Sequence, residues 1–556
     1  MPFKRTNNIE RYVILCWLAL MIIISAGCSA NYYREEADQQ VYEILRKGHQ
    51  KLYDSVQQYD IEQLALDPLK DLPKSQVPLI EIPKAMKRFS SAPLMISLEK
   101  AFEIAEYHNR EYQTQKEDVY LTALTLTGEK NEFSSQFGGL ISGLWSKTGD
   151  EESISAEGGL NVSRILKTGA SIGINLSTEF LRYLTGDPRR TVASILAVSI
   201  IQPLWRGAGE KIAAENLKQS ERNVIYAIRS LARYRKTFIV KTASSHFRVL
   251  QQRAVVRNER QNYQNLILAS DRAQMMAKAG RLPEFQADQA KQDELRAMDR
   301  WTRGVKTYYE LLDSYKIDLG LPIDANVDLD NADLENLVNS GIQHPDIELE
   351  KAVSMALDFR QDLKNVKEKV EDAERKIEVA KNSLGADISL NFEANVPNKP
   401  DTQAPELRFD DATCSGGFDV DLPFERLSER NAYRRTLITY KRLQRDLSLK
   451  TDEIKLEITG DWRSLQQAME SYNIQLNSVK LAQQRVESTS LLLQAGRVDT
   501  RDLLESRAAL VEAQNALVRA LMDHTIARLE FYRDNGTLKH DHTILDSIFS
   551  TSAVSH

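Results

Sequence analysis

The residues with the chemistry for catalysis or metal binding form no recognisable set in this chain. Ser245 and His246 pair a nucleophile with a base, but sequence neighbours on a helix point apart and cannot act together. His540 and His542 flank an aspartate, but they lie in a loose-looking C-terminal tail. We therefore expect no enzyme, no catalytic residue, no metal site and no cofactor.

Glycine spacing gives no nucleotide site either. Gly207-Ala-Gly209 is a fragment of a dinucleotide-binding loop, but no third glycine follows and the context is not a βαβ unit. The 556 residues contain 73 Lys plus Arg against 79 Asp plus Glu, a net charge of -6. With no basic stripe in the sequence, nucleic acid is not an expected partner.

The N-terminus reads as an export signal. Lys4, Arg5 and Arg11 precede an apolar run over residues 12–24, which is too short for a comfortable membrane span. Small residues then lead to Cys28, as in a bacterial lipoprotein signal, although Ser25 stands where that class favours Leu. Residues 1–27 would be removed and Cys28 lipidated. The alternative is ordinary cleavage nearby, with Cys28 left as a free thiol or removed.

No later apolar run reaches the length of a membrane-spanning helix, so no helix is expected to anchor the mature chain. Cys414 would be the remaining cysteine besides Cys28, which leaves no disulfide framework within one chain.

The chain repeats itself. Residues 96–105 (ISLEKAFEIA) return as residues 347–356 (IELEKAVSMA), with six of ten positions identical, and the Ala-Gly-Arg of residues 279–281 returns at residues 495–497. Self-similarity of this kind indicates two copies of one supersecondary unit. We predict a lead-in with a Pro-rich connector, two repeats and a tail, over residues 28–93, 94–330, 331–536 and 537–556.

Each repeat predicts the same order of elements. A helix of the first repeat should run from residue 96 to about 130, and its counterpart from 347 to about 383. Strand-like alternation follows, at 158–163, 169–177 and 192–201 in the first repeat and at 386–396 and 416–422 in the second.

A long helix then leads to each Ala-Gly-Arg break, and a helix of half that length follows it. The stretch between Gly209 and Gly280 has no Gly or Pro, and about 70 residues at ~1.5 Å each span about 105 Å. The second long helix should cover about 428–494. Trp462, Met469 and Leu476 recur every seven residues, which indicates side-by-side helix packing.

The strands need a partner chain. Two membrane-grade strands in each repeat would give four per chain, which cannot close into a barrel, and open strand edges are not tolerated in lipid. The first repeat has 35 more residues than the second between helix start and tip glycine, and we assign the excess to an extra hairpin around 160–177.

This arrangement resembles the outer membrane efflux protein (TolC) family over nearly the whole chain. The matching pieces are the duplicated Leu-Glu-Lys-Ala helix start, the strand-to-helix exits at 202–207 and 421–424, the hairpin at 167–174 and the turn-and-helix at 496–506. The fold class that the resemblance implies is mostly α with a β portion. Long helices would form an α-barrel and the strands an outer-membrane β-barrel of twelve strands, closed by a homotrimer.

The resemblance also implies a function and partners. Such proteins are passive exit ducts in the bacterial outer membrane, and their helical portion lies in the periplasm. The expected partners are a periplasmic adaptor (membrane fusion) protein, an inner-membrane transporter of RND or ABC type, and outer-membrane lipid. The cargo cannot be read from the sequence.

By the same resemblance, Gly280, Arg281, Gly496 and Arg497 would lie at the periplasmic tip where adaptors dock. The plain alternative for these glycines is a simple helix stop. Some family members lock the tip with a Tyr and an Arg at positions that here hold Leu493 and Val498, so this lock is not expected.

The family also lines its constriction with acids at two positions, which here hold Asp502 and Glu505. Three residues apart on a helix, the two share a face, and three copies would make two acidic rings that favour cations. The alternative is a solvated face at a helix start, where acids are favoured anyway.

Two other classes of protein stay open. One is a structural coiled-coil lipoprotein of the envelope without a pore, which would need no membrane strands. The other is a periplasmic adaptor, which also uses helical hairpins but has one hairpin and a lipoyl-like domain, unlike the duplicated pattern here.

Overall fold

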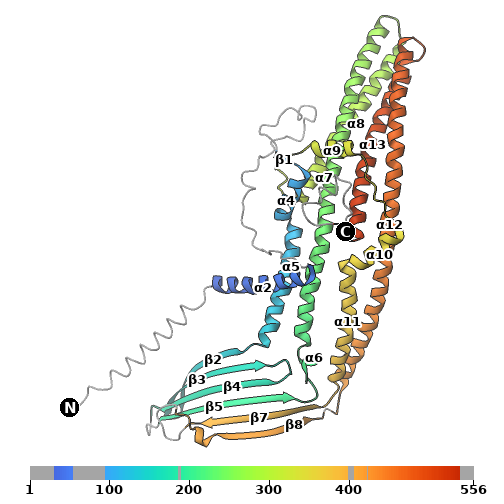
Figure 1. Cartoon of the computed structure of the whole chain (residues 1–556). Helices are drawn as coiled ribbons and strands as arrows, with labels where there is room; N and C mark the ends of the chain where they lie inside the picture. The colour runs from blue at the N-terminus through green and yellow to red at the C-terminus, as the bar shows by residue number, and fades with distance from the viewer. Residues whose placement is uncertain (1–29, 54–93, 186–189, 399–405, 423, 539–556) are drawn as a thin grey trace, which may run out of the picture. The chain divides into compact units, whose positions relative to one another are not determined.

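A computed structural model describes residues 30–53, 94–185, 190–398, 406–422 and 424–538 (Figure 1). These residues are mostly helical, with one large sheet and one two-stranded sheet. The chain divides into two units, each of which gathers segments from both halves of the sequence. The first unit includes residues 30–53, 118–228 and 371–441. The second unit includes residues 94–117, 229–370 and 442–538.

The first unit contains an antiparallel sheet of six strands in the order β2-β3-β4-β5-β7-β8. The strands are neighbours in the order in which the chain forms them, as Figure 1 shows. Their bounds are β2 (Gln136–Thr148), β3 (Glu151–Ile165), β4 (Ser171–Tyr183), β5 (Arg190–Pro203), β7 (Asp387–Pro397) and β8 (Thr413–Asp421).

Helical segments accompany this sheet in the first unit. The Asp372 carboxylate accepts a hydrogen bond from Tyr226 at 2.6 Å, which joins the two helices that carry these residues, and a second one from Arg375 of its own helix at 2.7 Å. The segments are α2 (Ala30–Tyr53), α6 (Glu210–Ala213), the 3₁₀ turn Phe409–Asp411 and the sheet-proximal parts of α5 (Arg110–Glu132), α7 (Glu215–Lys278), α11 (Gln361–Asn382) and α12 (Leu427–Gln494).

The second unit holds the remaining parts of these long helices and the larger hydrophobic core. Its further elements are β1 (Leu94–Ile96), α4 (Leu98–His108), α8 (Glu284–Asp318), β6 (Val327–Leu329), α9 (Ala332–Ser340), α10 (Leu349–Phe359) and α13 (Thr500–Asp534). Strands β1 and β6 pair in parallel. Phe247, Leu250 and Tyr315 are fully buried in the core between α7 and α8.

The sequence predicts one continuous helix after each copy of the duplicated segment, but both helices are interrupted in the structure. The first breaks at Asn109 and the second at Arg360, each in extended conformation with ψ 121. Asn109 stops one helix and starts the next, because its Oδ1 accepts from the Tyr112 N–H at 2.8 Å while its Nδ2 donates to the Asp318 carbonyl at 2.7 Å.

The strand prediction for the first repeat was also incomplete. That region supplies four strands, and β2 was missed. The predicted extra hairpin is present as β3 and β4, which are joined by a turn over residues 166–170. The predicted long helix after Gly209 is interrupted at Ala214, between α6 and α7.

Among the residues that the structure describes, no helix is long and apolar enough to cross a membrane.

Candidate functional sites

The six-stranded sheet has two chemically different faces. Successive residues of a strand point to opposite faces, and the register carries one alternation across all six strands. On β3 one face carries Ser155, Glu157 and Asn161, whereas the other carries Ile154, Leu160 and Val162. The apolar face continues on the other strands through Phe137, Ile141, Trp145, Ile172, Ile174, Leu176, Leu196, Val198, Ile200, Phe392, Val396 and Phe418.

The apolar face is open to the surroundings within one chain. Phe137 is 80% exposed, Phe418 is 73% exposed and Trp145 is 59% exposed. Soluble monomers rarely leave so much contiguous apolar surface uncovered, and such a face marks contact with a membrane or another chain.

The polar face is acidic. At its strand positions, within the described residues, it carries Asp and Glu but no Lys or Arg. Glu157 and Glu179 are direct cross-strand neighbours, as are Asp387 and Asp421. The acidic positions are Glu151, Glu157, Glu179, Asp387, Glu393, Asp419 and Asp421. Such a surface attracts cations over anions.

The two Ala-Gly-Arg breaks form the same turn. Gly280 has φ 64 and Gly496 has φ 69, the left-handed region that favours glycine. The N–H of Arg281 donates to the Met276 carbonyl and the N–H of Arg497 to the Leu492 carbonyl, each at 2.9 Å. These are Schellman helix ends, and the space around both glycines is open, so the backbone angle rather than packing requires glycine here.

The structure gives the two predicted constriction acids local partners. Asp502 belongs to a capping box at the start of α13, where its Oδ2 accepts from the Asp499 N–H at 3.3 Å. Glu505 pairs with Arg485 of α12 at 3.1 Å. Both side chains are exposed, whereas Leu504 between them is buried against α7 and α8.

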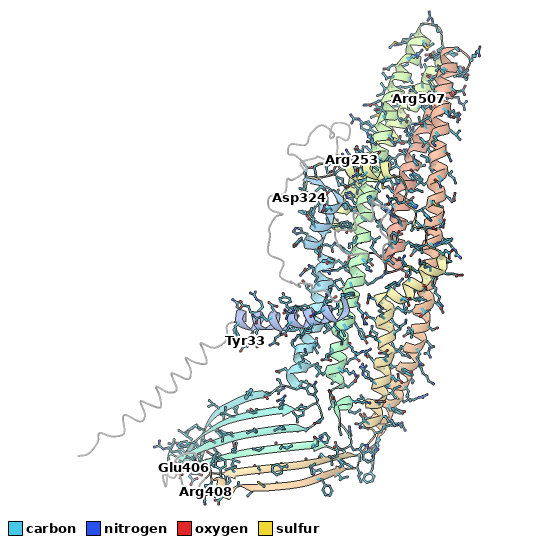
Figure 2. The ribbon with its side chains drawn as sticks, in the orientation of Figure 1. Tyr33, Arg253, Asp324, Glu406, Arg408 and Arg507 are labelled. Atoms are coloured by element: carbon cyan, nitrogen blue, oxygen red, sulfur yellow. The ribbon has the colours of Figure 1, made fainter. Side chains whose placement is uncertain are left out.

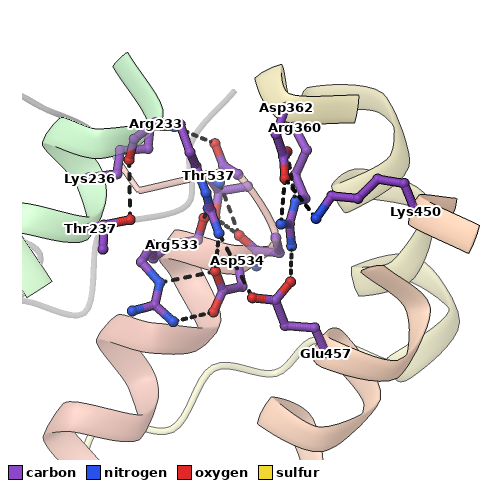
Figure 3. A network of polar contacts seen from close by, with 12 residues as sticks. Arg233, Lys236, Thr237, Arg360, Asp362, Lys450, Glu457, Arg533, Asp534 and Thr537 are labelled. Carbon is purple, nitrogen blue, oxygen red and sulfur yellow. Dashed lines mark hydrogen bonds and ion pairs between the residues drawn. The ribbon is translucent and has the colours of Figure 1, made fainter. Parts of the chain in front are cut away.

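A buried charge network joins α7, α12, α13 and the α10–α11 break (Figure 3). The guanidinium of Arg360, 3% exposed, binds Asp362 at 2.8 Å and Glu457 at 2.5 Å. Burial alone would raise the pKa of Asp362, but the Arg360 hydrogen bond and charge outweigh it and lower this pKa to about 2. Arg360 thus fixes the second helix break to α12.

The carboxyl groups of Asp461 and Asp534 lie near each other in this region, and their pKa values shift in opposite directions. Burial and the nearby Asp534 carboxylate raise the pKa of Asp461 to about 7. Asp461 Oδ2 is buried, and burial disfavours the charged form of this carboxyl group. Asp534 instead pairs with Arg233 and Arg533, and these charges lower its pKa against the effect of burial.

The sequence neighbours Ser245 and His246 do point apart. Ser245 donates to Asp318, whereas His246 contacts Tyr315 through Nδ1 and Asp333 through Nε2, each at 2.9 Å. His246 is fully buried, and Asp333 also accepts from the Leu98 N–H at 2.9 Å. This group therefore ties α4, α7, α8 and α9 together and has no access to a substrate.

Three of the residues considered in the sequence lie outside the described part of the chain. Cys28 lies outside the described residues, as do His540 and His542. Within residues 30–53, 94–185, 190–398, 406–422 and 424–538, no group of three or more His, Cys, Asp or Glu could hold a metal ion.

Sequence reasoning missed the Arg360 network altogether. Its members come from four segments that are far apart in the chain, so no local spacing signals it.

Comparisons with known proteins place the fold. No family model and no curated protein matches the chain. Among solved structures, the CmeC outer membrane channel of Campylobacter jejuni aligns with 84% of this chain and 94% of its own, at 13% identity and TM-score 0.59. CusC, a transmembrane channel, aligns over 84% and 99% at 14% identity and TM-score 0.58. The outer membrane protein VceC of Vibrio cholerae aligns over 79% and 96% at 15% identity and TM-score 0.57.

Proposed function

We propose that this chain, which has the fold of the outer-membrane efflux channels of the TolC family, is itself an outer-membrane channel. It would act as the passive exit duct of a tripartite efflux or secretion system. A periplasmic adaptor and an inner-membrane transporter of RND or ABC type would drive export through it.

The two-faced sheet is the observation that carries this proposal. Its apolar face would contact the hydrocarbon of the outer membrane and its acidic face would line water, which is the arrangement of membrane β-barrels. On β3 the apolar alternation from Ile154 to Val162 covers nine residues, close to the length of a spanning strand. Charged positions bound it, at Arg164 on one side and Glu152 on the other.

A homotrimer would complete the channel. Besides the sheet, the part of α12 in the second unit exposes Leu456, Ile474 and Leu481, which are 73%, 61% and 66% exposed. These side chains would pack against neighbouring copies in a helical barrel. The division into repeats at 94–330 and 331–536 belongs to the same proposal, supported by the same kind of turn at Gly280 and Gly496.

Adaptor docking is proposed for the two turns at Gly280–Arg281 and Gly496–Arg497. Both arginines follow a helix end whose geometry is the same in the two turns, so adaptor hairpins would meet a repeated surface. The acids Asp502 and Glu505 would form rings near this end of the duct. Cys28 would carry the lipid that adds a membrane anchor.

Single-channel recording in planar bilayers tests the channel. We expect the full-length protein, extracted in mild detergent, to give stepwise conductance, and native mass spectrometry to give a trimer whose subunits begin at Cys28 with acyl mass. A folded protein that stays monomeric and never conducts would contradict the proposal and favour a structural envelope lipoprotein without a pore.

A further inference from the structure

The first half of the chain contributes four strands to the large sheet, whereas the second half contributes two. We propose that all six belong to one membrane wall, so that three copies build a barrel of eighteen strands. This inference rests on the proposed channel function and concerns how wide its membrane portion is. It assigns β2 and β3 to the wall instead of to an appendage outside it.

The hydrogen-bond ladder supports a single wall. Strands β2 and β3 pair along Gln136–Thr148, and β3 and β4 pair along Ser153–Ile165 without a break in register. The pairing between β5 and β7, which joins the two halves of the sequence, is shorter than either. The extra strands are therefore held to the sheet at least as extensively as the others.

The face pattern also reaches the outermost strand. Phe137, Ile141 and Trp145 of β2 share the apolar face with Val162, Gly158 and Ile154 of β3. Aromatic side chains near both ends of an apolar band are typical of barrel walls at the two membrane interfaces. On this strand Phe137 and Trp145 occupy those two positions.

The turn between β3 and β4 packs against the segment that leaves β5. A Cβ on Gly169, at φ 92, would lie 2.6 Å from the Gly207 carbonyl oxygen and 3.1 Å from Pro203. The Gly209 N–H also donates to the Thr168 carbonyl at 2.9 Å. These contacts fix the connection between β3 and β4 against the exit from β5, which an external appendage would not require.

The two edges of the sheet need another copy of the chain. Strands β2 and β8 end the strand order, and each leaves a row of unpaired backbone groups, which hydrocarbon does not tolerate. Because six antiparallel strands are an even number, β2 and β8 run in opposite directions. Edge β8 of one copy can therefore continue the antiparallel ladder with β2 of the next, and even-numbered barrels of up to 26 strands are known.

Thiol cross-linking of the full-length protein tests this seam. Cys414 of β8 lies on the apolar face, opposite Ala394 of β7, and is exposed. A second cysteine is placed on β2, and membranes are treated with a short bifunctional methanethiosulfonate. The same-face variants are Ile141→Cys, Gly143→Cys and Trp145→Cys, and the matched opposite-face controls are Ser142→Cys and Leu144→Cys.

We expect covalent dimers and trimers at one or more same-face positions, in several-fold excess over the opposite-face controls. Replacing Cys414 by Ser should abolish them. A wall of four strands per chain would instead bring β8 against β4 of the next copy, so Thr178→Cys and Phe180→Cys form the competing arm.

The outcomes distinguish a wall of six strands per chain from a wall of four, and they test the channel separately. Cross-links through β4, or none through β2 in a preparation that still conducts, would overturn the wide barrel and leave the channel standing. A preparation that neither conducts nor forms trimers would overturn the channel itself.

Discussion

Asp461 is a buried carboxyl group that faces another one. With a pKa of about 7 in the folded chain against an ordinary value of 3.8, it holds a proton that the unfolded chain releases between these values. Folding stability therefore falls as the pH rises from about 4 to about 7, and the cost of its ionisation is complete above that window.

We expect Asp461→Asn to stabilise the protein, and to do so more at pH 8 than at pH 5, because the amide cannot ionise. Thermal unfolding at both pH values measures the difference between variant and parent. Asp452→Asn, at a side chain that is 69% exposed, is the control and should shift the melting temperature equally little at both. A gain for Asp461→Asn that is larger at pH 5 would refute this account.

Arg360 has the opposite character, since its guanidinium neutralises two acids in a buried place. Arg360→Met should destabilise the second unit by about 1–3 kcal/mol, because it removes the nearest counter-charge of Asp362 and Glu457 and leaves each with one more distant cation, Lys450 and Arg233. Urea unfolding followed by circular dichroism would show the loss. The control Arg303→Met removes an exposed pair with Asp299 and should cost less than about 1 kcal/mol.

At the scale of elements, the helix ends at the two turns depend on backbone angle. Gly496→Ala should cost about 1 kcal/mol, because alanine resists a φ of 69. Gly460 lies within α12 with open space around it, so Gly460→Ala should stabilise the helix by about 0.5–1 kcal/mol. Hydrogen exchange at the α12–α13 turn and in α12 would measure both changes in local stability. If both substitutions stabilised the protein, or both destabilised it, the result would count against the proposed role of the turn geometry.

The long helices could be predicted from the sequence because nothing in it stops them. The run without Gly or Pro predicted α7 apart from the interruption at Ala214, and the second long helix was predicted within one residue of the bounds of α12. Asn109 and Arg360 escaped prediction because their breaks are set by tertiary contacts with α8 and α12 and not by a helix-breaking residue type.

Strand β2 escaped for a different reason. Leu140 and Leu144 stand on its otherwise polar face and Gly139 and Gly143 on its apolar face, so the period of two is weak in the sequence. The register that restores the pattern comes only from pairing with β3.

Among the candidate sites, the positive φ of Gly280 and Gly496 was predictable from the Ala-Gly-Arg repeat. The capping box of Asp499 and Asp502 is also visible in the sequence as acids three residues apart. The salt bridge from Glu505 to Arg485 depends on how α12 and α13 pack, which no local pattern encodes.

At the scale of the whole molecule, the sign of charge along the duct of the proposed channel would decide which ions pass. Asp502→Asn with Glu505→Gln should reduce cation preference, seen as a smaller reversal potential across a salt gradient in planar bilayers. Glu310→Gln, an exposed acid of α8, is the control and should leave the reversal potential unchanged. Unchanged selectivity in the double variant would remove these acids from the constriction.

The described residues that follow the gap after β7 offer a site for probing the proposed channel from outside the cell. Glu406 and Arg408 lie at the end of the sheet (Figure 2), where Glu406 N–H donates to Asn398 Oδ1 at 2.8 Å. This end is opposite the one at which β5 and β8 lead into helices. In the proposed channel it would face the cell exterior, so a peptide tag inserted there should be accessible on intact cells.

The two open edges of the sheet have a genetic consequence. In the proposed channel, a chain that cannot close its own wall would have no membrane-compatible state alone, so each pore would be a joint product of its subunits. One copy with a blocked edge would spoil the whole assembly. If normal and edge-blocked chains were expressed equally and mixed at random in threes, about one assembly in eight would be intact. Such an allele should behave as dominant negative.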